Sequence, residues 1–180
     1  MTLKPHFELM ADYNQWMNRQ LYECAGQLST AELEANRGAF FKSIIGTLNH
    51  ILVGDTIWLK RFASHSAEFE SLRYLLNIEP PKTLDTVLHA KLKPLQTARF
   101  ELDERIKMFS LELNPETVSS SLTYRNTKGE TFTKNLGHLI QHFFNHQTHH
   151  RGQVSTLLYQ VGIDMGVTDL LARIPDESPI

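Results

Sequence analysis

Apolar residues recur every three or four positions through four long stretches of this chain, which is the spacing of one face of an α-helix. Glycine and proline are scarce and stand mostly at the joints between the stretches. Four amphipathic helices in 180 residues predict an all-α fold, a four-helix bundle. The predicted helices cover residues 5–26, 40–63, 83–113 and 135–161.

The connections between these helices are also predicted. Ser29 and Glu32 form a capping-box pattern for a short turn. Residues 64–82 form a crossover, and Pro94 predicts a kink or an early irregularity in the third helix. Residues 118–133 predict a short β-hairpin, inserted before the last helix, whose turn uses Gly129. No repeat or linker divides the chain, so we expect a single domain over residues 1–180.

The charge and composition exclude several classes of protein. The formal net charge is −2 and both signs are interspersed, so nothing indicates a partner among nucleic acids or anionic membranes. The one cysteine cannot form an internal disulfide. There is neither a signal-peptide pattern nor an apolar run near the ~20 residues of a membrane span. These features predict a cytoplasmic protein.

Five of the nine histidines fall between residues 138 and 150, in the last helix. Two histidines four residues apart lie on one helix face, where neutral imidazoles can bind the same metal ion. On a helical wheel, His146 and His150 lie within or at the edge of the apolar stripe. His142 is borderline, and His138 and His149 point towards solvent. The pattern therefore favours His146 and His150 as two metal ligands.

A third ligand could come from the second helix, which offers His50 and Asp55. The wheel for that helix places Asp55 in the main apolar stripe and His50 nearly opposite, and so favours Asp55. A set of two histidines and one carboxylate would suit non-haem iron. Asp55 could instead orient a ligand imidazole, or be a buried carboxylate bonded to Trp58 or to a neighbouring helix.

Three segments carry a resemblance to a known family. They are ADYNQWMN at residues 11–18, LNHILVGDTIW at residues 48–58 and NHQTHHRGQ at residues 145–153. In type, order and approximate separation they resemble the DinB/YfiT-like superfamily over nearly the whole chain. The resemblance implies a bundle of up-down-down-up topology, commonly paired as a homodimer. It also implies a divalent metal, most often zinc or nickel, with iron or manganese as further options.

Carried over by position, the metal ligands that the resemblance implies are His50, His146 and His150. This supports His50 over Asp55, against the wheel, and the second helix does have apolar residues on its other side as well.

Some members of the superfamily are transferases that use low-molecular-weight thiols such as bacillithiol or mycothiol. We therefore expect a metal-dependent enzyme acting on small molecules, as a thiol-dependent transferase or a hydrolase. Asp55 or His142 would tune the ligands, and Arg151 would bind an acidic substrate group or form a salt bridge near the hairpin. The alternative is a non-catalytic metal or small-molecule binding protein, or a stress-response protein with a structural metal site.

Overall fold

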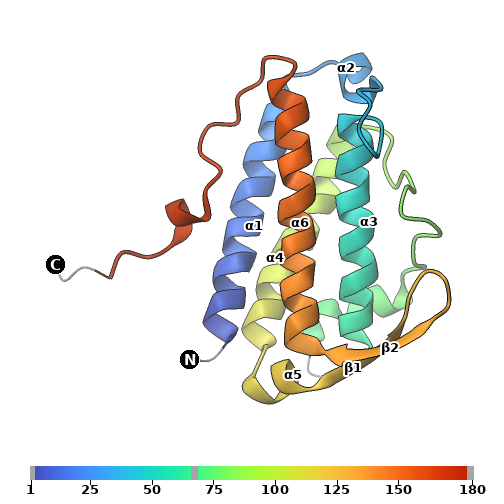
Figure 1. Ribbon diagram of the computed structural model, residues 1–180, viewed down its shortest axis with the longest axis vertical. Coiled ribbons are helices and arrows are strands. Elements are labelled where there is room, and N and C mark those ends of the chain that lie inside the picture. The colour runs from blue at the N-terminus through green and yellow to red at the C-terminus, as the bar shows by residue number, and fades with distance from the viewer. Residues whose placement is uncertain (1–2, 66–68, 178–180) are drawn as a thin grey trace.

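The computed structural model of the protein describes residues 3–65 and 69–177 (Figure 1). Four long helices lie side by side. Helix α1 contacts α4 and α6, and α3 contacts α6 and α4. The four are α1 (Lys4–Ala25), α3 (Ile44–Ala63), α4 (Leu92–Glu112) and α6 (Leu136–Tyr159). The predicted fold class is confirmed at its coarse level, as a mostly helical chain with one small β-hairpin.

The first and last long helices run in one direction, and the two between them in sequence run in the opposite direction (Figure 1). In Figure 1, α1 and α6 run upward, whereas α3 and α4 run downward. Their apolar faces meet in one core, where Phe62 of α3 stacks on Phe109 of α4 with ring centroids 5.7 Å apart. Phe143 of α6 meets Phe62 edge to face at 5.9 Å. Each such aromatic pair contributes about 0.5–1.5 kcal/mol beyond the area that it buries.

Shorter elements join the long helices. Helix α2 (Thr30–Glu34) begins with the predicted capping box of Ser29 and Glu32. After α5 (Pro115–Ser119), strands β1 (Ser121–Arg125) and β2 (Thr131–Asn135) form the predicted hairpin, which is antiparallel. Its turn contains Gly129 at a φ of 84°, a left-handed conformation that favours glycine. Two 3₁₀ segments complete the chain, η1 (Glu70–Asn77) and η2 (Leu170–Arg173).

The prediction that the second long helix begins at Phe40 was wrong by four residues. The helix begins at Ile44, where the Ser43 hydroxyl caps the backbone N–H of Gly46. Lys42, just before it, has a φ of 67°, which a right-handed helix does not allow. The preceding residues therefore form a loop over the end of α3.

The third long helix begins at Leu92, nine residues later than predicted. Residues 83–91 instead run as an irregular strap that the Asn49 side chain holds on α3, through bonds to both the N–H and the carbonyl of His89. Pro94 lies in the first turn of α4, where its missing N–H has no intrahelical partner to lose, so no kink is needed. The predicted crossover includes residues 66–68, which lie outside the described part of the chain.

Among the described residues, no helix combines the length and the apolar character that crossing a membrane requires.

Candidate metal centre

Helices α3 and α6 bring three histidines to one point. His50 comes from α3, and His146 and His150 lie one turn apart on α6. The His50 Nε2 atom lies 3.2 Å from Nε2 of His146 and 3.1 Å from Nε2 of His150. All three candidate ligand atoms lie within 4.8 Å of one another. The three residues that the resemblance implied are therefore together in the folded chain.

Hydrogen bonds at the far side of two rings determine where the ring protons lie. His50 Nδ1 lies 2.8 Å from the carbonyl oxygen of Leu84, and His150 Nδ1 lies 2.8 Å from Oε1 of Gln153. Both oxygens are acceptors, so each Nδ1 must carry the proton and donate it. Each Nε2 then presents a lone pair to the centre of the cluster. Outer partners of this kind typically orient histidines that bind metal.

The nitrogen separations fit a metal ion. Zinc–nitrogen bonds of about 2.0–2.1 Å at tetrahedral angles place two ligand nitrogens about 3.3 Å apart. The observed separations of 3.1 and 3.2 Å are close to that value. Without a cation, the lone pairs of His50 and His150 would face each other with no proton between them. The cluster can therefore hold a divalent metal ion.

The electrostatic surroundings keep the imidazoles neutral, which metal binding requires. Burial, together with the neighbouring His150 and His50, lowers the pKa of His146 to about 3. Burial also lowers the pKa of His50 and of His150. Protons therefore compete weakly with a metal for these nitrogens at neutral pH.

One aromatic ring and one glycine shape the space around the cluster. Phe41, in the loop before α3, stacks on His50 with ring centroids 3.7 Å apart and meets His150 edge to face. On the other side, Gly54 leaves room for His146, since a Cβ atom at residue 54 would lie 2.8 Å from Cε1 of that ring. The backbone of α3 thus approaches His146 as closely as glycine permits.

A cleft of about 260 Å³ opens beside the cluster, and His50 and His146 are part of its wall. Trp58 and Tyr124 form an aromatic side of this cleft, with ring centroids 5.2 Å apart. His142, which the wheel left borderline, meets Trp58 edge to face and lines the same cleft. It does not belong to the ligand group among the described residues. His149 is exposed, as predicted.

Asp55 is buried but does not join the histidines. Its Oδ2 accepts hydrogen bonds from Arg99 of α4 and, at 2.7 Å, from Gln147 of α6. The helical wheel correctly placed this carboxylate inside, and the reading as a carboxylate bonded to neighbouring helices is the one that the structure matches. Its role as the third metal ligand is contradicted by these contacts.

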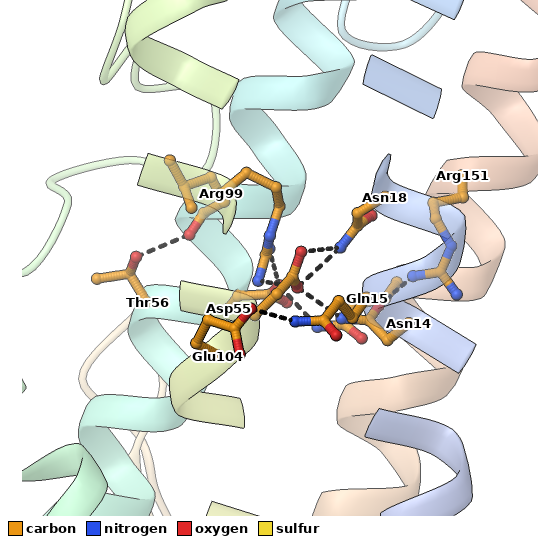
Figure 2. Close-up of polar contacts among 11 residues, drawn as sticks. Asn14, Gln15, Asn18, Asp55, Thr56, Arg99, Glu104 and Arg151 are labelled. Atoms are coloured by element: carbon orange, nitrogen blue, oxygen red, sulfur yellow. Dashed lines mark hydrogen bonds and ion pairs between the residues drawn. The ribbon is translucent and has the colours of Figure 1, made fainter. Parts of the chain in front are cut away.

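Figure 2 shows that Asp55 belongs to a buried polar network between the helices. Arg99 pairs with Asp103 at 2.9 Å, and Asp103 accepts hydrogen bonds from Asn14 at 3.0 Å and Asn18 at 2.9 Å. Burial raises the pKa of Asp103 to about 6, and the charge of Arg99 opposes this shift. Burial raises the pKa of Asp55 in the same way.

Sequence reasoning missed this network. The sequence held one signal of it, namely polar residues four positions apart within the apolar faces of two helices. These pairs are Asn14 with Asn18 and Arg99 with Asp103. Arg151 also belongs to it, since it is buried and donates to the Asn14 side chain. Neither expectation for Arg151, a substrate contact or a salt bridge near the hairpin, matches that position.

Fold and site together define a class: a mostly helical protein with a three-histidine cluster between two of its long helices. The model of the DinB family matches residues 1–177, and the chain belongs to this family. It is similar to Protein DinB of Bacillus subtilis (strain 168), with 24% identity over 159 residues that cover 88% of this chain and 87% of the relative. No solved structure gives a significant match.

Proposed function

We propose that this chain binds one divalent transition metal through His50, His146 and His150, and uses it in an enzyme reaction on small molecules. The observation that carries the proposal is the convergence of the three Nε2 atoms, two of them with their lone pairs directed by hydrogen bonds. Zinc or nickel suits an all-imidazole set best, and iron or manganese is a further option.

The position of the cluster favours a catalytic site over a closed structural one. Catalytic metal sites usually have three protein ligands and one open position, whereas structural sites have four protein ligands. Here three histidines are available among the described residues, and two of them line the cleft. A divalent ion in such a site supplies Lewis-acid chemistry, because it lowers the pKa of a bound water or thiol.

The chain's own residues would then bind and orient the substrate in the cleft. Trp58 and Tyr124 exclude water from one side, and His142 lies near enough to exchange protons with a bound molecule. Burial lowers the pKa of His142, so it is a neutral acceptor near pH 7. A thiol-dependent transferase and a hydrolase both fit this arrangement.

The second candidate is a non-catalytic protein whose metal fastens helices together. The ligands come from both α3 and α6, so a bound ion would join these helices whatever else it does. Substrate turnover by the metal-loaded protein, absent from the metal-free protein, would favour the enzyme. Metal-dependent stability without turnover of any thiol or hydrolase substrate would favour the structural role.

Five further properties belong to the proposal. The four long helices form a bundle of up-down-down-up topology, supported by their directions and contacts. The chain is one domain that pairs as a homodimer, which sedimentation would test. It works in the cytoplasm, and as a transferase it takes a low-molecular-weight thiol as its cosubstrate.

Metal stoichiometry tests the ligand assignment. The protein is purified without an affinity tag, stripped with a chelator, reloaded with zinc or nickel and analysed by mass spectrometry of the metal. We expect about one ion per wild-type chain, and a loss of stoichiometric binding after His50→Ala, His146→Ala or His150→Ala, because two imidazoles hold a transition metal poorly. Helical content should stay nearly unchanged.

His149→Ala is the matched control, since this histidine is exposed and adjoins His150 on the same helix. It should retain the wild-type stoichiometry. Unchanged metal content in the three ligand variants would show that the assignment is wrong.

A further inference from the structure

The cleft beside the histidines continues into a second hollow. The second cavity, about 400 Å³, lies between α3, the segment at residues 80–82 and the tip of the β-hairpin. It shares four lining residues with the first cavity, so the two form one groove. The shared residues are Ile57, Arg61, Asn126 and Thr127.

One face of α3 forms the floor of this groove. His50, Gly54, Ile57, Arg61 and Ser64 follow one another at spacings of four and three, which places them on a single helix face. His50 and Arg61 are eleven positions apart, or about 16 Å along the axis at 1.5 Å per residue. The groove thus has the histidines at one end and Arg61 towards the other. The distance between them along α3 suits an elongated small molecule.

The far end of the groove is positively charged. Within residues 3–65 and 69–177, its lining includes Lys60, Arg61, Lys82 and Arg125 and no aspartate or glutamate. The ammonium group of Lys60 already has partners within the chain, because it donates hydrogen bonds to the carbonyl oxygens of Leu75 and Leu76. The side chains of Lys82 and Arg125 are exposed and form no hydrogen bond or ion pair within residues 3–65 and 69–177. They are free to contact a ligand.

Arg61 is held in place at the junction of the two cavities. Its guanidinium lies 4.5 Å from the ring centre of Trp58 and 4.8 Å from that of Tyr124, and it donates to the carbonyl of Arg125. No carboxylate among the described residues forms an ion pair with it, although it is partly buried and burial lowers its pKa. Stacking alone would explain the position of Arg61, but not the gathering of further cations beside it.

We propose that this groove binds an elongated small molecule whose anionic group, a carboxylate or a phosphate, is held by Arg61, Lys82 and Arg125 while its other end faces the three histidines. Charge-assisted hydrogen bonds from arginine suit both kinds of anion. The aromatic side formed by Trp58 and Tyr124 would cover the middle of the molecule. This inference rests on the proposed function, since it names the class of substrate for the same site.

Fluorescence of Trp58 can test the inference. The chain has two tryptophans, so Trp16→Phe leaves Trp58 as the only reporter. In this background the metal-loaded protein is titrated with phenylphosphonate, phenylacetate and the neutral benzyl alcohol. We expect the better of the two anions to bind about tenfold more tightly than the alcohol. The ratio between phenylphosphonate and phenylacetate identifies which anionic group the site prefers.

A charge-matched pair of variants separates the groove from general electrostatics. Lys82→Gln with Arg125→Gln should weaken anion binding about fivefold, because two direct charge contacts are lost, and should leave benzyl alcohol binding unchanged. Lys91→Gln with Lys93→Gln removes two exposed cations outside the groove, and anion binding should then change less than about twofold. An equal loss in both pairs, or no preference for anions, would overturn the inference.

Metal content is measured in the same samples. Wild-type stoichiometry with no preference for anions removes this inference and leaves the proposed function intact. If the wild-type protein prefers anions but holds no metal after reloading, the proposed function is wrong. The claim that the anion is part of a substrate for the histidine cluster then fails with it.

Discussion

Two hydrogen bonds and one glycine, Gly54, set the geometry of the histidine cluster. The Leu84 carbonyl and the Gln153 side chain fix the rings of His50 and His150 from outside, whereas the buried Nδ1 of His146 has no hydrogen-bond partner in the described part of the chain. The position of the His146 ring therefore depends on packing. Gly54 provides that packing, because its lack of a Cβ lets the ring lie directly on α3.

Replacing Gly54 by alanine should weaken metal binding by about 10- to 100-fold, the range typical of changes to groups that orient metal ligands. The new Cβ would lie 2.8 Å from the His146 ring, which must move away from the other two nitrogens. Competition with a chromogenic chelator measures the affinity. Gly152→Ala is the control, since a Cβ there meets nothing within 4 Å and alanine favours the helix. Equal affinities of the two variants would contradict this role of Gly54.

At the scale of the elements, α3 is the helix on which both polar features depend. One face carries Asp55 into the buried network, and the other carries His50 and the floor of the groove. Gln147 links the two features, because it bonds to Asp55 and directly follows His146 on α6. The network therefore ties α3, α4 and α6 together at the level of the histidines.

Replacing Arg99 by methionine should lower the free energy of unfolding by about 3–5 kcal/mol, because Asp55 and Asp103 would remain buried without their cation. Urea denaturation followed by circular dichroism measures the change. Lys93→Met, at an exposed position of the same helix, should cost less than about 0.5 kcal/mol. A loss below about 1 kcal/mol in Arg99→Met would show that the carboxylates do not need this partner.

For the whole molecule, the site exists only when the chain is folded, since His50 and His146 are 96 residues apart in sequence. Folding buries three imidazoles in a form that resists protonation, and this links stability to pH. The unfolded chain has ordinary histidines with a pKa near 6.5, whereas the pKa of His146 in the folded protein is about 3. The contribution of His146 to stability is therefore complete above about pH 6.5 and is lost as the pH falls towards about 3.

Urea denaturation of the metal-free protein between pH 7.5 and 5 should show a free energy of unfolding that falls with decreasing pH. Asp103 acts in the opposite direction, because its pKa is raised to about 6 and its contribution grows as the pH falls from there. Comparison with His146→Gln isolates the histidine, and the variant should have the shallower dependence. Parallel curves would mean that His146 titrates normally in the folded protein.

Local patterns determined much of this protein. The apolar spacing predicted the helical class and the approximate spans of the long helices, since a buried helix face places apolar residues in every turn. The capping box at Ser29 and the glycine turn of the hairpin depend on neighbouring residues only. The inward direction of His146 and His150 follows from the phase of α6 for the same reason.

Tertiary structure alone decided which other polar groups meet these histidines. Helix α3 is packed on more than one side, so its wheel could not tell the face of Asp55 from the face of His50. The partners that separate them, Arg99 and the Leu84 carbonyl, lie 44 and 34 residues further along the chain. The strap at residues 83–91 and the charged end of the groove also depend on contacts between distant segments. A helical period records how much of a face is buried, but not which neighbour covers it.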